Sequence, residues 1–142
     1  MDKQRMKTMA DRVFRDMAGG MAAGLAFIGT ETGLFRAMSG QGPLLYADIV
    51  KLTNLNARYV EEWLKGMVAC SYLDYDAVNQ TYTLPAEHGY LLSSEGTDHF
   101  MGGIFAMLPP LLAVAPRVVQ AVRNGVAYRL RNSHRNAVMQ SI

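Results

Sequence analysis

The fold is decided by residues 42–84, GPLLYADIVKLTNLNARYVEEWLKGMVACSYLDYDAVNQTYTL. Asn56 is suited to begin a helix in this stretch, because its side-chain oxygen can accept a hydrogen bond from a free N–H of the first turn. After Asn56 the apolar residues recur at helical spacing, which places them on one stripe. The stripe consists of Tyr59, Val60, Trp63, Leu64, Met67 and Val68. A shorter helical segment and a tight turn precede it, so the stretch predicts a helix-turn-helix.

Beyond Cys70 the apolar period changes from about 3.6 residues to 2, which indicates β-strands. Two short strands are predicted, over residues 72–76 and 81–84, joined by a turn in which Asn79 is able to accept a left-handed conformation. Helix, turn, helix and hairpin is the order of a winged helix-turn-helix. The predicted fold class is therefore mainly α with a small β-hairpin, flanked by N- and C-terminal helices.

The bulk composition limits the number of domains and the compartment. A chain of 142 residues, half of them hydrophobic, forms one domain or one domain with an appendage. The single cysteine, Cys70, excludes an internal disulfide and fits a reducing cytosol. Residues 1–17 are charged throughout and do not resemble a signal peptide. We expect a cytoplasmic protein.

The net charge of +2 conceals an asymmetry along the chain. Residues 1–98 contain nine Lys and Arg against all twelve Asp and Glu, whereas residues 99–142 contain five Arg and no acidic residue. The basic character therefore belongs to the C-terminal third. An arginine-rich segment with few aromatic residues is typical of a solvated tail, and we favour that interpretation over binding of nucleic acid there.

The N-terminal segment has the pattern of a long helix over residues 6–28. Its apolar residues recur every four positions, at Met9, Val13, Met17, Met21 and Leu25. The run GGMAAG at residues 19–24 is unusual in a helix, since each interior glycine costs about 1 kcal/mol relative to alanine. The glycines either break the helix or let another helix approach closely. The absence of charge between Met17 and Thr30 favours the second interpretation, a buried helix–helix contact.

Two proline- or glycine-containing segments flank the helix-turn-helix. Gly40 and Gly42 follow a predicted helix rather than a strand, so a turn is favoured over a phosphate-binding loop. Residues 100–116 carry no charge, but Pro109 and Pro110 interrupt them. This excludes one straight helix and argues against a membrane span. We predict two short apolar helices, one on each side of Pro109, then a short helix over residues 116–123 and a loosely ordered tail.

Residues 32–103 resemble the N-terminal winged-helix domain of a bacterial family of class I S-adenosylmethionine-dependent methyltransferases. The resemblance is carried by TGLFRAM (32–38), LTNLNARYVEEWLKGM (52–67), YLDYD (72–76), YTLPAEHGYLL (82–92) and HFMGG (99–103). It implies four regions. They are a dimerisation helix region at 1–31, the winged helix-turn-helix at 32–92, apolar C-terminal helices at 93–124, and the basic, loosely ordered tail at 125–142.

In that family the winged-helix domain is non-catalytic: it mediates dimerisation and helps to cap the substrate pocket. A downstream Rossmann-like domain binds S-adenosylmethionine through a glycine-rich loop, and no such loop follows Leu84 here. The resemblance therefore implies a form truncated before the donor-binding domain and not active alone. It further implies a homodimer formed through the apolar helices, with S-adenosylmethionine and a small-molecule substrate bound only by the full-length enzyme.

The family role of residues 99–105 makes His99, Phe100 and Phe105 candidates to line a substrate pocket. Ordinary helix packing is the competing interpretation.

Two positions depart from the family pattern. Leu45 stands where the first helix of the motif usually has a capping hydroxyl residue, and Ser71 stands where a glycine usually follows the second helix. If Ser71 takes a left-handed conformation, the connection to the wing is strained.

A DNA-binding transcriptional regulator is the alternative function for a winged helix. The exposed face of the second helix carries Arg58 and Lys65 but also Glu61 and Glu62, and the wing is acidic, so the clustered basic residues of a DNA-binding surface are missing. No catalytic, cofactor-binding or metal-ligating residue is predicted. The candidate metal ligands and the candidate nucleophile have no further ligand or base at suitable spacing in the sequence. These candidates are Asp74, Asp76, His88, His99, His134 and Cys70.

Overall fold

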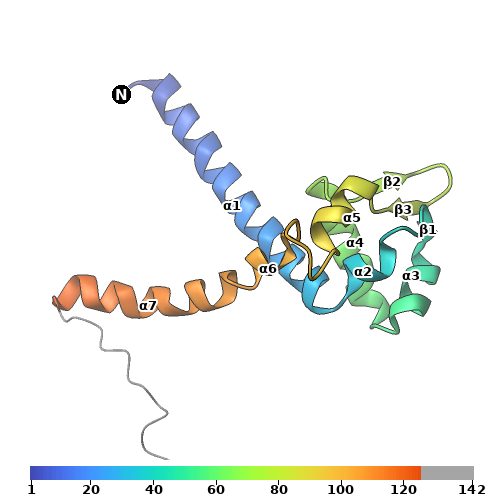
Figure 1. The fold of residues 1–142 in the computed structure, drawn as a ribbon. Helices are drawn as coiled ribbons and strands as arrows, with labels where there is room; N and C mark the ends of the chain where they lie inside the picture. Colours follow the sequence, from blue (N-terminus) through green and yellow to red (C-terminus); the bar gives the residue numbers. More distant parts are fainter. Residues whose placement is uncertain (126–142) are drawn as a thin grey trace, which may run out of the picture. The chain divides into compact units, whose positions relative to one another are not determined.

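The computed structural model describes residues 1–125. The chain divides into two compact units, Met1–Leu108 and Pro109–Ile142, and the predicted loosely ordered tail lies outside the described residues except for Gly125. The elements in chain order are α1 (Lys3–Glu31), α2 (Leu34–Met38), β1 (Leu44–Leu45), α3 (Tyr46–Thr53), α4 (Ala57–Ala69), β2 (Asp74–Asp76), β3 (Thr81–Thr83), α5 (Ala86–Leu92), α6 (Gly102–Phe105) and α7 (Leu108–Asn124) (Figure 1).

The predicted winged helix-turn-helix is confirmed. Helices α3 and α4 form the helix-turn-helix, and a small antiparallel sheet forms the wing. The sheet has three strands in the order β1-β3-β2, rather than the two of the predicted hairpin, with Leu44 opposite Tyr82 and Tyr75 opposite the same Tyr82. Strand β1 is only two residues long, too short to show an alternating apolar pattern.

The turn of the wing differs in detail from the prediction. Gln80, not Asn79, has the positive φ, at 55°. The Asn79 side chain instead donates a hydrogen bond to the Asp76 carboxylate, which also accepts from the backbone N–H groups of Val78 and Asn79. These bonds, the one from the Asn79 side chain first, lower the pKa of Asp76. Asp76 therefore closes the turn with its side chain.

Helix α4 presents its apolar stripe to the core largely as predicted. Val60, Trp63, Leu64 and Met67 are buried, whereas Tyr59 is 72% exposed and was wrongly assigned to the buried stripe. Tyr59 belongs to the first turn of the helix, at one end of the stripe. The predicted cap is confirmed, because the Asn56 side chain accepts a hydrogen bond of 3.1 Å from the Arg58 N–H.

Both departures from the family pattern have structural consequences. Leu45 is the N-cap residue of α3, and its side chain makes no capping hydrogen bond. Ser71 has a φ of 61° in the turn that ends α4, where Tyr72 N donates to Met67 O at 2.9 Å and Ser71 N donates to Val68 O at 3.0 Å. This hydrogen-bond pattern commonly places glycine at the left-handed position. A serine there costs about 1–2 kcal/mol of backbone strain.

The core forms where the C-terminal part of α1 crosses α4 and α2. Trp63 Nε1 donates a hydrogen bond of 2.8 Å to the carbonyl oxygen of Leu25, and the Trp63 and Phe35 rings meet edge to face with centroids 5.1 Å apart. Gly29 makes this approach possible, since a Cβ there would lie 2.4 Å from Trp63 Cζ2. The buried hydrophobic residues are Ala26, Leu34, Phe35, Met38, Ile49, Val60, Trp63, Leu64, Met67, Leu73, Tyr82, Leu84 and Leu92.

The GGMAAG run does not break α1, which continues to Glu31. A Cβ at Gly19, Gly20 or Gly24 would meet nothing within 4 Å, so among the described residues no helix approaches closely at these three glycines. The expected close approach is therefore not found there in a single chain. It occurs further along, at Gly29 of α1 and at Gly66 of α4.

The apolar C-terminal region differs from the prediction. A short helix, α6, precedes Pro109 as expected, but α7 runs without interruption through Pro116, so the separate helix over 116–123 was wrong. Pro109 and Pro110 lie in the first turn of α7, where a missing N–H removes no helical hydrogen bond. By length and composition, residues 102–124 would suffice to cross a membrane, since an 18-residue window within them has a mean hydropathy of 1.6; this is weak evidence for a span.

Substitution of two glycines by alanine tests the α1–α4 crossing. A Cβ at residue 29 meets the rigid rings of Trp63 and Phe35, at 2.4 and 2.7 Å, whereas a Cβ at residue 66 meets only the flexible end of Leu25, at 2.6 Å. We expect Gly29→Ala to lower the free energy of unfolding by about 1–3 kcal/mol. Gly66→Ala costs less, because the flexible Leu25 side chain can move aside, whereas the helix preference of alanine, about 1 kcal/mol, applies at both positions.

Urea unfolding of both variants and the wild type, at one protein concentration, measures the difference. A cost for Gly66→Ala equal to or above that of Gly29→Ala would contradict the described crossing.

Candidate functional site

An apolar cavity of about 360 Å³ lies within the first unit. It is formed by the turn after α4, by α5, and by α6 with the residue that precedes it. A volume of this size falls in the range of small-molecule sites. The lining residues are Ser71, Tyr72, His88, Leu91, Leu92, Met101, Ile104 and Phe105.

Aromatic rings make one wall of the cavity and join it to the core. The Tyr72 and Phe105 ring centroids are 6.4 Å apart with an angle of 58° between the planes, and Tyr72 also stacks on Phe35, with centroids 6.5 Å apart. Leu92 is buried at the base, whereas Ile104 is 56% exposed and Met101 is also exposed. The cavity is therefore closed by core residues on one side and accessible to a small molecule on the other.

His88 supplies the most defined polar group of the cavity. Its Nδ1 lies 2.8 Å from the backbone carbonyl oxygen of Tyr72, and its ring lines the cavity. None of the eight lining residues carries a carboxylate, an ammonium or a guanidinium group. No nucleophile in this set has a hydrogen-bonded base beside it, so the arrangement is suited to binding rather than to catalysis.

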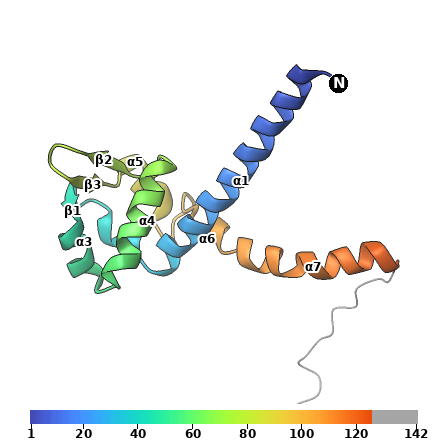
Figure 2. The ribbon, with the colours of Figure 1, turned by 180° about the vertical axis from the view of Figure 1, so that it is seen from behind.

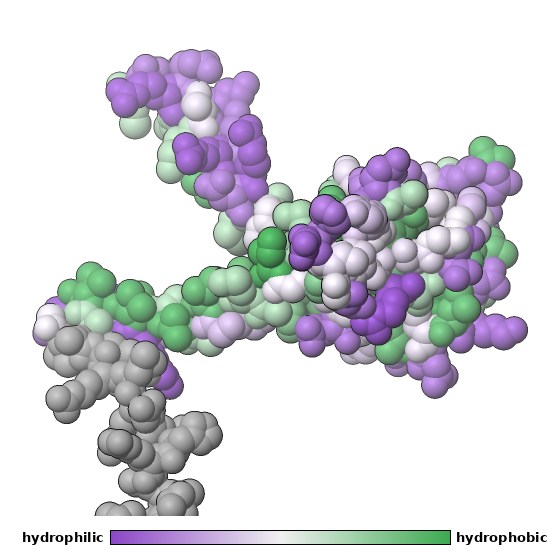
Figure 3. Space-filling view, viewed as in Figure 1, coloured by the Kyte–Doolittle hydropathy of each residue, from purple (hydrophilic) through white to green (hydrophobic). Residues whose placement is uncertain are grey.

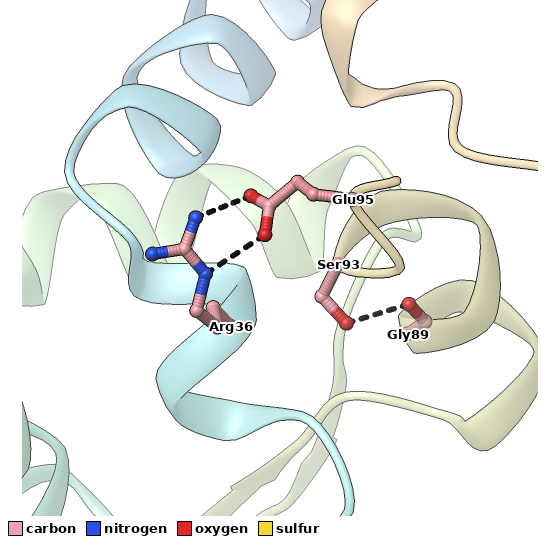
Figure 4. Close-up of polar contacts among 4 residues, drawn as sticks. All are labelled: Arg36, Gly89, Ser93 and Glu95. Atoms are coloured by element: carbon pink, nitrogen blue, oxygen red, sulfur yellow. Dashed lines mark hydrogen bonds and ion pairs between the residues drawn. The ribbon is translucent and has the colours of Figure 1, made fainter. Parts of the chain in front are cut away.

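An ion pair holds the loop between α5 and α6. Arg36 of α2 donates through Nε and Nη2 to the two Glu95 carboxylate oxygens, at 2.9 and 2.5 Å (Figure 4). Ser93 Oγ donates to Gly89 O at 2.7 Å in the same view, and Met101 N donates to Leu91 O at 2.7 Å. The hydrogen bonds from Arg36 lower the pKa of Glu95. The loop that carries Met101 to the cavity is thus fixed at both ends.

The three predicted pocket residues are not brought together. Phe105 lines the cavity. His99 instead lies against the Tyr90 ring, with centroids 5.2 Å apart, and the Phe100 ring lies over Gly102, where a Cβ would be 2.6 Å from Phe100 Cε2. Sequence reasoning missed His88 as a lining residue, because its partner is a backbone carbonyl 16 positions away. A bond to the backbone leaves no side-chain pattern to detect.

A second candidate surface is the apolar face of α1. Residues 1–21 are all exposed, and the N-terminal half of α1 extends away from the rest of the first unit in both views (Figures 1 and 2). We call this surface the α1 apolar face; its side chains are 48–75% exposed. It consists of Met6, Met9, Val13, Phe14, Met17 and Met21.

Helix α7, described by itself, is also apolar and uncovered. Hydrophobic surface runs along it in Figure 3, and none of its residues is buried. Its exposed large apolar residues are Leu111, Leu112, Val114, Val118, Val119 and Val122. Each of the two units, taken by itself, therefore exposes an apolar helical surface among its described residues.

The outer face of α4 offers a nucleic acid no net positive charge, because Arg58 and Lys65 are matched by Glu61 and Glu62. Lys65 Nζ forms an ion pair with Glu61 Oε1 at 2.7 Å, and this hydrogen bond raises the pKa of Lys65. The wing tip is acidic, with Asp76 engaged in its own turn. Within residues 1–125, no group of three or more His, Cys, Asp or Glu side chains lies close enough to hold a metal ion.

The Arg36–Glu95 pair predicts a pH-dependent part of the stability. Because the pKa of Glu95 is lowered in the folded chain, its ionised form stabilises the fold above the unfolded pKa. That contribution is lost as the pH falls through the folded pKa. We expect wild type to be more stable than Glu95→Gln at about pH 6, and the difference to be smaller at about pH 3, below the unfolded pKa of a glutamate.

Urea unfolding at the two pH values, with and without added salt, measures this difference. Asp98→Asn is the control, since Asp98 lies in the same loop and forms no ion pair among the described residues. A wild-type advantage over Glu95→Gln that does not shrink between about pH 6 and about pH 3 would contradict the assignment.

The fold is similar to parts of larger solved structures. A structure of PigF with SAH is 24% identical, with a TM-score of 0.65, covering 87% of this chain and 34% of that chain. N,N-8-amino-8-demethyl-D-riboflavin dimethyltransferase (RosA) from Streptomyces davawensis is 20% identical, with a TM-score of 0.66, covering 82% and 34%. Human N-acetylserotonin methyltransferase with SAM is 20% identical, with a TM-score of 0.65, covering 90% and 36%.

At these identities the likeness is one of fold, and the chain spans about a third of each of those structures. The predicted resemblance to the winged-helix domain of S-adenosylmethionine-dependent methyltransferases is confirmed at that level. A comparison with curated proteins gives no match. Residues 19–94, from α1 to the loop after α5, match the family model described as the Rv2258c-like winged HTH domain. Since this match covers more than half of the chain, the protein belongs to the Rv2258c-like winged helix-turn-helix domain family.

Proposed function

We propose that this chain is the dimerisation and substrate-cap part of an S-adenosylmethionine-dependent methyltransferase. The observation that carries the proposal is the α1 apolar face, whose six large side chains are all substantially exposed in one chain. The fold similarity to a part of two methyltransferases supports the kind of enzyme. The cavity between α5 and α6 supports the cap role, because it offers a small-molecule acceptor an apolar surface.

The occupant proposed for the α1 apolar face is a second copy of the chain. Contiguous exposed apolar surface on a soluble protein usually marks an interface. Most homo-oligomers use the same patch on both subunits, so a helix with a continuous apolar row can pair with its own copy. The exposed apolar residues of α7 would be covered in the same assembly. Helices from two chains would then share one core.

The methyl donor belongs to a different domain in this proposal. Dinucleotide- and donor-binding α/β domains hold their ligand at the carboxyl ends of parallel strands, beside a glycine-rich turn. The described sheet has three short antiparallel strands, and Gly40 and Gly42 follow α2 rather than a strand, so residues 1–125 do not fit S-adenosylmethionine. We expect methyl transfer, and use of a small-molecule substrate, only together with a donor-binding domain. We place the protein in the cytoplasm.

A DNA-binding regulator is the less supported alternative. A recognition helix must bring net positive charge to the phosphates. In α4 the exposed lysine is paired with Glu61, and Glu62 adds a further negative charge beside it. These contacts favour a protein or small-molecule partner over a nucleic acid.

One substitution in α1 tests the proposed dimer. Met17→Asp places a charge in the middle of the α1 apolar face, and burying that charge in an interface is unfavourable. We expect wild type to have twice the mass of one chain at micromolar concentration, and Met17→Asp to raise the dissociation constant about tenfold or more. Static light scattering over a concentration series measures both.

The matched control is Thr8→Asp, which adds the same charge on the opposite side of α1 and should leave the mass unchanged. A wild-type monomer, or equal weakening by the two substitutions, would contradict the proposed interface. Tight binding of duplex DNA that weakens steeply with salt would instead favour the regulator.

A further inference from the structure

We infer that the cavity between α5 and α6 binds an uncharged, flat, largely apolar molecule through one hydrogen-bond donor that the ligand presents to His88. The inference names a class of ligand for the cavity. The biological role of that ligand rests on the proposed substrate-cap function, whereas its binding to the cavity does not.

The Tyr72 carbonyl determines which nitrogen of His88 carries the hydrogen. A carbonyl oxygen only accepts hydrogen bonds, so Nδ1, at 2.8 Å, is the donor. In the neutral imidazole the other nitrogen, Nε2, then has the lone pair and accepts. Since Nδ1 is occupied by the backbone, the ring edge left for a ligand in the cavity is the one that contains Nε2. The site therefore selects a hydroxyl or N–H group.

The same carbonyl is held rigidly, so the direction of the acceptor is fixed before a ligand binds. Tyr72 N donates to Met67 O at 2.9 Å in the turn that ends α4, and the Tyr72 ring stacks on Phe35 of the core. Both ends of the loop that carries Met101 are also tied down, by the Arg36–Glu95 pair and by the bond from Met101 N to Leu91 O. A preformed site loses less entropy when it binds.

The remaining lining residues decide the rest of the ligand. None of the eight lining residues carries a carboxylate, ammonium or guanidinium group that could pair with a charged ligand. Burying an unpaired charge among apolar side chains is costly, so the cavity favours an uncharged ligand. The rings of Tyr72 and Phe105 lie on one side, with Leu91, Leu92 and Ile104 around the cavity. Aromatic walls favour a flat ring system that stacks on or packs edge-on against them. The volume of about 360 Å³ accommodates a small bicyclic molecule.

A pair of probes separates the hydrogen bond from apolar burial. The first probe is 2-naphthol, and the second is 2-methoxynaphthalene, which has the same ring system without the donor. We expect the whole chain to bind 2-naphthol about fivefold to tenfold more tightly, the difference that one hydrogen bond contributes. Probe fluorescence at about pH 7, where the phenol-like hydroxyl of 2-naphthol is uncharged, measures both affinities.

Variants of two histidines locate the effect. His88→Phe should remove the preference for 2-naphthol while 2-methoxynaphthalene still binds, and His88→Gln should restore part of it, because its amide can donate to Tyr72 O and accept from the ligand. His99→Phe is the control, since His99 lies against Tyr90 and does not line the cavity, and should keep the full preference.

Nitrogen NMR of the wild-type histidines gives a readout that does not depend on folding of the variants. We expect the Nδ1–H tautomer for His88 and a change in the Nε2 shift when 2-naphthol, but not 2-methoxynaphthalene, is added. The inference is overturned if wild type binds neither probe, if it shows no preference, if the preference survives in His88→Phe, or if the Nε2 shift does not respond.

Light scattering on the same samples separates this inference from the proposed function. A monomer that binds 2-naphthol through His88 contradicts the dimerisation role and supports the site. A dimer that binds neither probe supports the dimer and overturns the site.

Discussion

The indole ring of Trp63 holds α1 to the winged helix, and the rest of the structure depends on this contact. Its Nε1 binds the Leu25 carbonyl, its ring edge meets Phe35, and Gly29 leaves the space that the ring needs. Trp63 thereby orders the C-terminal end of α1, the start of α2, and the core under α4. It contacts only that end of α1, and residues 1–21 are exposed beyond the rest of the first unit. The C-terminal end of α1 is packed in the core, whereas the α1 apolar face is exposed. This combination is the structural basis of the proposed dimer.

Much of the fold could be predicted from the sequence because its signals are local. Asn56 as a cap, the apolar stripe of α4 and the change to a period of two after Cys70 each reflect the geometry of one element. The errors lie at positions whose structure is determined by tertiary contacts rather than by the local sequence. Strand β1 is defined by its pairing with β3. Tyr59 lies at the N-terminal end of the apolar stripe of α4 and is exposed, whereas most of the later residues of the stripe are buried. Pro116 is accommodated inside a helix that has no buried residue.

The cavity was less predictable than the fold. Phe105 was identified through the family role of its segment, and it does line the cavity. His99 and Phe100 were named for the same reason, but the loop held by Arg36 and Glu95 directs them to Tyr90 and Gly102. His88 could not be found from spacing, because its orientation is set by the carbonyl of Tyr72, and that carbonyl is positioned by the left-handed Ser71. Sites built from backbone groups and tertiary contacts leave little trace in one sequence.

The central claim is that a second copy of the chain covers the free part of α1. Hydrogen–deuterium exchange of the α1 backbone amides over a range of protein concentrations tests it most directly. An isolated helical extension with glycines at 19 and 20 should open readily. We therefore predict rapid exchange in residues 3–20 at low concentration, and protection that increases as the chain concentration passes the dimer dissociation constant. Rapid exchange in these residues that does not depend on concentration would contradict the claim.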